Sequence, residues 1–407
     1  MIKREKYLEK IRPFYDQDLI KVITGIRRCG KSVLLTQIID EIKESGVKES
    51  QIIYLNFEFL DYSFIKNEED LNKYIKEKIT NKDKYYIFLD EIQSVESWEK
   101  AVNSFKASLN VSIFITGSNS DLLSGELATH IAGRYVSFKI YPFSFKEVCE
   151  FKNPLNNEEK EILFNDYIIW GGMPQRYMFT NEEMVKTYLR DIYDSIILKD
   201  IIQRFKIKEV DLFNRIIEYI VTTPAQTLSV TNLSSYFLNK DNRSVSSETI
   251  YNYLDYMVRS LLINKCDKYD IRGKRILNGK YKYYLTDLGL GQVNNTGKRP
   301  QIGAYLENIV YNELISRDYD VFVGSTLKGE VDFIATKHDE KIYIQVAYIL
   351  ADENVIKREF GVFNSIEDNY PKYVITADKF DFSKDGIIHK NIIDWLLEWK
   401  QKNIIII

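Results

Sequence analysis

The feature that most constrains this chain is a glycine-bounded loop between an apolar segment and an amphipathic one. The loop at residues 25–32 reads Gly-Ile-Arg-Arg-Cys-Gly-Lys-Ser, which fits the pattern GxxxxGK[ST]. The apolar run at residues 19–24 predicts a short buried strand, and residues 34–42 place apolar side chains at helical spacing. Strand, loop and helix in this order form a P-loop. The pattern therefore predicts a site for a nucleoside triphosphate, and a glycine turn without a ligand is the weaker alternative.

The residue types of the loop suit the binding of a phosphate chain. Glycines let backbone N–H groups close around phosphate oxygens, and the following helix presents the positive end of its dipole. Lys31 is expected to neutralise the β- and γ-phosphates, and the Ser32 hydroxyl to bind Mg²⁺. The expected contacts of the nucleotide are Gly25, Arg27, Arg28, Cys29, Gly30, Lys31, Ser32 and Val33.

A second apolar run ends in two adjacent acids. Residues 85–89 predict a buried strand that brings Asp90 and Glu91 to its carboxyl end, which is the Walker B pattern. Asp90 would hold Mg²⁺ through water or Ser32, and Glu91 would orient and polarise the attacking water. Paired acids are common in turns, but their place after a P-loop favours a catalytic site.

Polar residues follow two other predicted strands. Asn119 or Ser118 comes after the apolar run at residues 111–116 and would act as the sensor of the γ-phosphate and the water, with a solvated loop as the alternative. Asn56 lies at the end of another predicted strand, residues 51–57. We expect that Asn56 could hydrogen-bond Glu91 and hold it inactive until a ligand arrives.

Arg134 closes a helix that we expect at residues 127–134. This position suits an arginine finger, which stabilises the charge that develops on the transferred phosphoryl group. It could act on the nucleotide of its own subunit or on that of a neighbour. A surface salt bridge is the alternative role.

Together these motifs resemble the AAA-superfamily ATPase module found in many bacterial and archaeal proteins of unassigned role. The resemblance spans nearly the whole chain, and it implies ATP, Mg²⁺ and a long C-terminal domain of unknown function. It rests on the P-loop, Leu89–Gln93, Thr116–Asn119, Gly133-Arg134 with Tyr141–Ser144, and the turn Trp170–Pro174.

The middle of the chain changes from two long amphipathic helices to three shorter ones and a hairpin. The first pair would form a lid or linker over the nucleotide, and the later elements predict a winged helix. The hairpin carries a basic turn with interleaved tyrosines, where Lys274 and Arg275 are candidate contacts for the phosphates of double-stranded DNA. A protein contact or a solvated hairpin is the alternative.

The last part of the chain resembles the restriction-endonuclease-like fold. Glu307 and Asp332 match the Mg²⁺ ligands of that fold, but Gln345 stands where Glu is usual and Ala347 where Lys is usual. Because alanine cannot stabilise a pentacovalent phosphate, we expect an inactive nuclease fold that binds rather than cuts. Lys357 on the following helix is the candidate for a displaced lysine.

Composition limits the partners and the compartment. The net charge of −3 and the pI of about 5.9 exclude a global basic field for nucleic acid. Three scattered cysteines lack metal-type spacing and predict a reducing, cytoplasmic compartment. No apolar run approaches the length needed to span a membrane, and the Ile404–Ile407 run is too short to anchor the chain in one. This run would be a packed last strand or an exposed apolar end that tends to associate.

We therefore expect an α/β protein with a P-loop parallel sheet, a helical lid, a winged helix and a degenerate restriction-endonuclease-like domain. The expected boundaries are 1–150, 151–208, 209–295 and 296–407. The leading function is an ATP-hydrolysing conformational switch that acts on DNA or a protein partner, in a chain that could form a homo-oligomer. The alternatives are an ATP-gated nuclease and a nucleotide-stabilised scaffold with little turnover.

Overall fold

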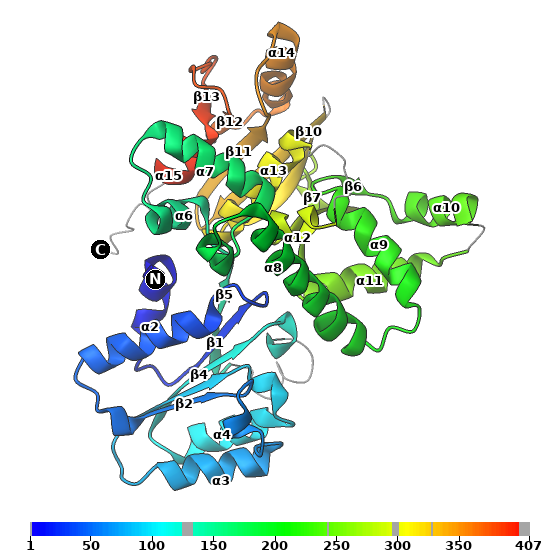
Figure 1. Cartoon of the computed structure of the whole chain (residues 1–407). Helices are drawn as coiled ribbons and strands as arrows, with labels where there is room; N and C mark the ends of the chain where they lie inside the picture. Colours follow the sequence, from blue (N-terminus) through cyan, green and yellow to red (C-terminus); the bar gives the residue numbers. More distant parts are fainter. Residues whose placement is uncertain (1, 124–132, 242–243, 295–300, 327–328, 399–407) are drawn as a thin grey trace. The chain divides into compact units, whose positions relative to one another are not determined.

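The computed structural model describes residues 2–123, 133–241, 244–294, 301–326 and 329–398. The chain divides into two compact units, each of which contains its own sheet (Figure 1). The first unit consists of residues 1–142 with 259–261, and the second of residues 143–258 and 262–407. No helix among the described residues is long and apolar enough to cross a membrane.

The first unit is built on a five-stranded parallel sheet with the order β2-β3-β4-β1-β5. Its strands are β1 (Ile20–Gly25), β2 (Ile52–Asn56), β3 (Tyr85–Asp90), β4 (Val111–Gly117) and β5 (Tyr135–Ile140). The helices are α1 (Glu5–Ile11), α2 (Lys31–Glu44), α3 (Glu68–Lys78) and α4 (Trp98–Ser108). The expected P-loop sheet is confirmed.

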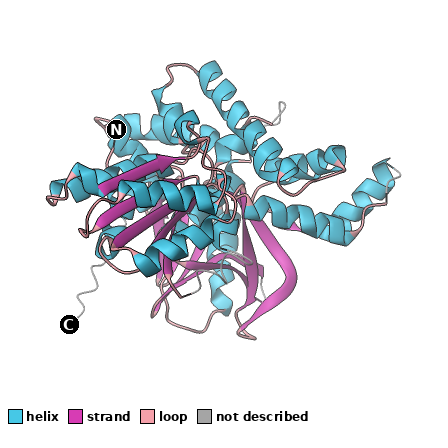
Figure 2. Cartoon of the chain, turned by 90° about the horizontal axis from the view of Figure 1, so that it is seen from below, coloured by secondary structure: helices cyan, strands magenta, loops and turns pink. Residues whose placement is uncertain are grey.

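Helices cover both faces of this sheet, with α2 on one side and α3 and α4 on the other (Figures 1 and 2). Every residue of β1 and β3 is consequently buried, which is why both strands appear in the sequence as mainly apolar runs. Parallel strands need crossover helices, and these connections bring the carboxyl ends of all five strands to one edge. That edge carries the loops that follow β1, β3 and β4.

The second unit begins with helices and ends in a mixed eight-stranded sheet. Its helices are α6 (Phe145–Lys152), α7 (Asn157–Trp170), α8 (Glu182–Ser195) with a π-helical continuation (Ile196–Gln203), α9 (Val210–Thr222), α10 (Val230–Asp241), α11 (Ser247–Arg259), α12 (Leu288–Gln292), α13 (Ile302–Ser316), α14 (Glu353–Gly361) and α15 (Ile392–Glu398). Its strands are β6 (Thr227–Leu228), β7 (Ile263–Asp270), β8 (Arg275–Leu285), β9 (Asp320–Thr326), β10 (Gly329–Lys337), β11 (Glu340–Val346), β12 (Lys372–Thr376) and β13 (Ile387–Asn391). The C-terminal part is thus an α/β structure, as expected.

The sheet of the second unit joins two segments that we expected to be separate domains. Its order is β13-β12-β11-β10-β9-β7-β8-β6, and the parallel pair β7–β9 connects the hairpin to the C-terminal strands. The backbone groups at the outer edge of β7 pair with β9 instead of facing solvent. Residues 209–295 and 296–407 therefore share one sheet, whereas we expected a domain boundary between them.

Two sequence predictions concern residues that the structure does not describe. The helix expected at residues 127–134 lies outside the described residues, except for Gly133 and Arg134, which precede β5. The Ile404–Ile407 run also lies outside them.

The N-terminal segment is attached to α2 by a charged contact at Glu41. The Arg12 guanidinium donates to both carboxylate oxygens at 2.9 and 2.8 Å, and the Tyr15 hydroxyl donates at 2.8 Å. Lys3 adds an ion pair at 2.8 Å. The hydrogen bond from Arg12 is the main reason that the pKa of Glu41 falls to about 2. The ionised carboxylate therefore stabilises the folded unit.

We predict that Glu41→Gln lowers the stability of the first unit by about 2 kcal/mol at pH 7, because a hydrogen bond to a charged group contributes ~1.5–3 kcal/mol. The folded pKa lies below the ordinary 4.5, so the stabilisation is present above pH 4.5 and disappears as the pH falls toward 2. Native-state hydrogen exchange of β1 amides measures it. Glu44→Gln, on the exposed end of the same helix, is the matched control. Equal protection of both variants at pH 7 would contradict this prediction.

Candidate nucleotide-binding site

The loop between β1 and α2 has a backbone that requires its glycines. Gly30 has φ +104°, and a Cβ at Gly25 would lie 2.5 Å from the carbonyl oxygen of Ile140 and 2.7 Å from Cys29 Sγ. Arg28 also adopts a left-handed conformation, with φ 66°. Gly30 gives the first turn of α2 no side-chain cap, so this helix start suits an anion. The loop therefore has the shape that a phosphate chain needs.

Two side chains hold the loop from the side of β5. The Cys29 thiol lies 3.7 Å from the Ile140 carbonyl oxygen, and burial raises the pKa of this thiol, so it stays protonated. The buried Arg4 guanidinium donates to the carbonyl oxygens of Cys29 at 3.0 Å and Tyr141 at 3.1 Å. Cys29 can thus offer a nucleotide its backbone but not a thiolate. Sequence reasoning missed Arg4, which lies in a charged segment without a motif.

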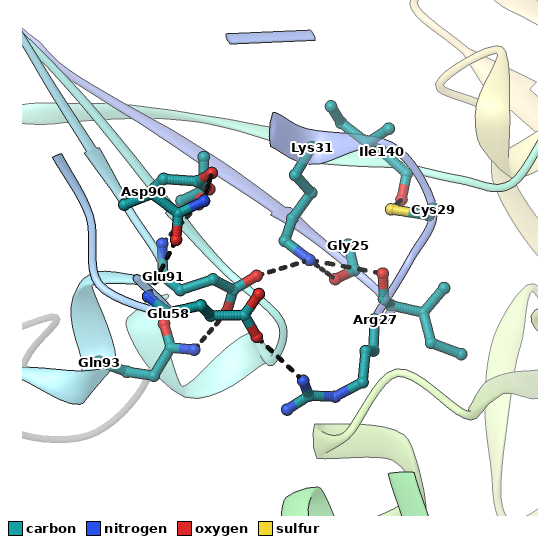
Figure 3. Close-up of polar contacts among 12 residues, drawn as sticks. Gly25, Arg27, Cys29, Lys31, Glu58, Asp90, Glu91, Gln93 and Ile140 are labelled. Carbon is teal, nitrogen blue, oxygen red and sulfur yellow. Dashed lines mark hydrogen bonds and ion pairs between the residues drawn. The ribbon is translucent and has the colours of Figure 1, made fainter. Parts of the chain in front are cut away.

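Lys31 and Glu91 form an ion pair at the carboxyl edge of the sheet (Figure 3). Lys31 Nζ lies 3.1 Å from Glu91 Oε1 and donates to the Gly25 carbonyl oxygen at 3.1 Å. Burial alone would lower the pKa of Lys31 and raise that of Glu91, but their mutual attraction outweighs it: the pKa of Lys31 is raised and that of Glu91 is lowered. Both groups are therefore charged at neutral pH.

Gln93 holds the other oxygen of Glu91. Its side-chain amide donates to Glu91 Oε2, and its own Oε1 is buried and has no hydrogen-bond partner among the described residues. A Cβ at Gly117 would lie 2.7 Å from this oxygen, so the glycine makes room for the Gln93 side chain. Figure 3 shows Glu91 between Lys31 and Gln93. The sequence motif includes Gln93 but does not indicate this contact.

Asp90 lies in a network of hydrogen-bond donors. Its Oδ2 accepts from the Tyr54 hydroxyl at 3.0 Å and from Asn56 Nδ2 at 3.1 Å, and its Oδ1 accepts from the Thr116 hydroxyl. The expected bond from Asn56 to Glu91 is therefore wrong. The parallel register pairs Asn56 with Asp90, which places the amide beside this carboxylate instead.

The residues expected to bind Mg²⁺ offer the donor types that this ion prefers. Ser32 lies in the first turn of α2 and Asp90 at the end of β3, and hydroxyl and carboxylate oxygens are typical ligands of Mg²⁺. Mg²⁺ is commonly held by one or two such groups together with substrate phosphates and water. Ser32 fits this ion directly, whereas Asp90, whose oxygens already accept hydrogen bonds, fits it through water or Ser32.

The candidate sensor residues lie at the same edge of the sheet as the loop. Ser118 and Asn119 are buried and follow β4, whose last residue Gly117 pairs with Thr24 at the end of β1. The parallel register thus brings the P-loop, the Walker B acids and both sensor candidates to one edge.

Arg134 lies at the opposite edge. It is exposed, and its carbonyl oxygen accepts from Ile20 N at 2.9 Å, at the start of β1. The P-loop begins where β1 ends, at Gly25, five residues after Ile20 or about 17 Å along an extended strand. The Arg134 side chain therefore cannot reach a nucleotide bound at its own P-loop.

The candidate DNA contacts Lys274 and Arg275 are exposed at the turn between β7 and β8. Two further lysines of this hairpin are engaged by carboxylates, since Lys268 pairs with Glu330 at 2.6 Å and Lys282 with Glu307 at 3.0 Å. The basic surface is consequently smaller than the sequence suggests.

The structure brings two of the three nuclease-like residues together around a lysine. Lys282 Nζ lies 3.0 Å from Glu307 and 3.9 Å from Asp332. Gln345 has other partners: its Oε1 accepts from Asp332 N at 3.2 Å, and its amide donates to Glu359 at 2.9 Å. Lys357, the candidate for a displaced lysine, is exposed and pairs with Glu353 at 3.4 Å.

Two family models match parts of the chain, and one solved structure shows a distant likeness. A family model described as an AAA domain matches residues 17–149, and a model described as a domain of unknown function matches residues 161–298. The ORC2 protein of Aeropyrum pernix, solved in ADPNP and ADP complexes, is similar with a TM-score of 0.39 and 11% identity, over 76% of this chain and 92% of that one.

Two uncharacterized proteins match over most of their length. One from Haemophilus influenzae is 40% identical over 402 residues, which cover 98% of this chain and 99% of the relative. One from Methanocaldococcus jannaschii is 31% identical over 399 residues, with 94% and 87% covered. The chain therefore belongs to one family with these two proteins, and residues 17–149 form its AAA-type P-loop domain.

Proposed function

We propose that this protein hydrolyses ATP at the P-loop of the first unit and uses the reaction as a conformational switch on DNA or a protein partner. The Lys31–Glu91 ion pair is the observation that supports this most directly. It joins the residue expected to bind the γ-phosphate to the residue expected to activate water.

The replacement of Glu91 by phosphates at Lys31 would couple the binding of ATP to its hydrolysis. The β- and γ-phosphates carry more negative charge than one carboxylate, so they would take Lys31 from Glu91. Glu91 would then keep the Gln93 amide as its partner and turn its other oxygen toward the attacking water. Bound Mg²⁺ would neutralise charge on the phosphates, held by Ser32 and Asp90.

Arg134 would act on the nucleotide of a neighbouring subunit. Its exposure at the edge opposite the P-loop suits a residue that a second copy of the chain presents to the γ-phosphate. Asn119 or Ser118 would contact the γ-phosphate from the same subunit. On this proposal the active form is a homo-oligomer.

The second unit would contact the partner. Its described elements α9, β6, α10, α11, β7 and β8 follow the order of a winged helix, with β6 paired to β8. The exposed basic turn at Lys274 and Arg275 would contact DNA phosphates, which position a protein without reading sequence.

For the P-loop, we predict that Lys31→Ala abolishes ATP binding, because the γ-phosphate loses its nearest cation. Glu91→Gln should bind ATP as the wild type does and lower kcat by about 10²–10⁴, the usual contribution of a general base. Lys43→Ala, an exposed lysine on the same helix, is the control. Calorimetric titration and phosphate release separate the two effects. Hydrolysis by Glu91→Gln at the wild-type rate would exclude Glu91 as the base.

For Arg134, we predict that Arg134→Ala lowers kcat by as much as ~10³-fold and that the wild-type rate per subunit rises with protein concentration. Mixing provides a sharper measurement. A Lys31→Ala subunit still offers Arg134, and an Arg134→Ala subunit still offers a P-loop, so a mixture should regain activity that neither variant has alone. A concentration-independent rate with full activity of Arg134→Ala would leave only the salt-bridge role.

For the basic turn, we predict weak binding to duplex DNA that falls steeply with salt. Replacing Lys274 and Arg275 by alanine should flatten the slope of log K against log[salt] by ~2, since each phosphate contact contributes about −0.9. The matched control replaces Lys357 and Lys379, two exposed lysines elsewhere in the second unit. If the DNA affinity changes neither with salt concentration nor with the substitutions in the turn, a protein becomes the better candidate for the partner.

A further inference from the structure

The second unit contains three carboxylates that converge on one point, Glu307 of α13 and Glu330 and Asp332 of β10. We call them the carboxylate cluster. Glu307 and Asp332 are largely buried, with side chains 13% and 11% exposed. These two are also the residues that the nuclease-like sequence pattern assigns to Mg²⁺. The question is therefore which cation balances the negative charge of the cluster, a metal ion or a side chain of the protein.

The ammonium of Lys282 lies at the point where the three carboxylates meet. It is 3.0 Å from Glu307 Oε1, 2.5 Å from Glu330 Oε1 and 3.9 Å from Asp332 Oδ1, and its side chain is 8% exposed. The lysine therefore places its ammonium where a cation bound by these carboxylates would lie.

Further contacts use the remaining oxygens of the cluster. Lys268 donates to Glu330 Oε2 at 2.6 Å, and Asp332 Oδ2 accepts from Val346 N at 2.8 Å. The Tyr284 hydroxyl donates to Glu307 Oε1 at 2.7 Å. Two lysines thus face three carboxylates, and hydrogen-bond donors already occupy oxygens that a metal would need.

The arrangement does not fit a bound divalent metal. In the part of the chain that the structure describes, no group of three or more histidine, cysteine or acidic side chains could hold one. Gln345 already directs its oxygen to Asp332 N and its amide to Glu359, so a metal would compete with these contacts. A metal would also have to displace Lys282 and leave a buried ammonium without partners, and an unpaired buried charge is strongly unfavourable.

We propose that Lys282 permanently takes the place of a divalent metal in the carboxylate cluster. The residue comes from β8, so the same contact ties the β7–β8 hairpin to α13 and β10. The second unit then needs no metal to fold. It retains the carboxylates of a nuclease-like site, with a lysine as the built-in cation.

The first test measures Mn²⁺ binding to the full wild-type chain without nucleotide, by electron paramagnetic resonance. We expect no bound Mn²⁺ that depends on the cluster, so the wild type and Asp332→Asn should give the same titration. A stoichiometric site in the wild type that Asp332→Asn removes would overturn the proposal. This comparison needs no change at Lys282.

The second test removes the lysine. Lys282→Met should lower the melting temperature in EDTA and gain a Mn²⁺ site, with Mn²⁺ restoring part of the lost stability. Lys265→Met, which removes a half-exposed lysine paired with Asp267 on β7, should show neither effect. A folded Lys282→Met chain that binds no more Mn²⁺ than Lys265→Met would overturn the proposal. So would metal-dependent DNA cleavage by the wild type that both Asp332→Asn and Lys282→Met abolish, since Lys282 would then be a catalytic lysine.

Discussion

The ion pair between Lys31 and Glu91 is the interaction on which the proposed chemistry depends. Neither residue could remain charged alone at this depth, because desolvation opposes the ionised form of each. The parallel sheet makes the pair, since the crossover connections bring the ends of β1 and β3 to one edge. Glycine at positions 25 and 117 leaves room for the groups around it. A ligand with stronger negative charge can exchange for Glu91 at Lys31.

Lys282 is a second buried lysine with carboxylate partners. Comparing it with Lys31 shows why the partner of Lys31 can be exchanged for a ligand. Lys31 has one carboxylate and backbone carbonyl oxygens as partners, and it lies beside a loop shaped for an anion. Lys282 has three carboxylates within 3.9 Å, on elements of a continuous sheet and its helix. One anion can replace a single carboxylate at Lys31, whereas no single ligand replaces three fixed ones at Lys282. The same residue type thus suits a switch in one unit and a permanent contact in the other.

The sequence predicted best those features that follow from local pattern. The apolar runs before Gly25 and Asp90 predicted the strands, and the place of the acids after a P-loop predicted a catalytic site. Side-chain partners were not predictable in this way. Asn56 donates to Asp90 instead of Glu91 because the register of β2 against β3 places the amide beside Asp90. This register cannot be predicted from the sequence of either strand alone. Gln93 lies only two residues after Glu91, but the conformation of the turn after β3 decides that its amide faces this carboxylate. Arg4 and Lys282 reach partners that are distant in sequence, so no spacing indicates them. The same holds for the β7–β9 pair, which joins two segments that differ in sequence pattern.

A structure of the chain with Mg²⁺ and a non-hydrolysable ATP analogue would test the central claim most directly. The account predicts that Lys31 Nζ contacts phosphate oxygens, that Glu91 has left Lys31, and that Glu91 still accepts the hydrogen bond from Gln93. A bound analogue with the Lys31–Glu91 contact intact near 3.1 Å would contradict the proposed exchange of partners.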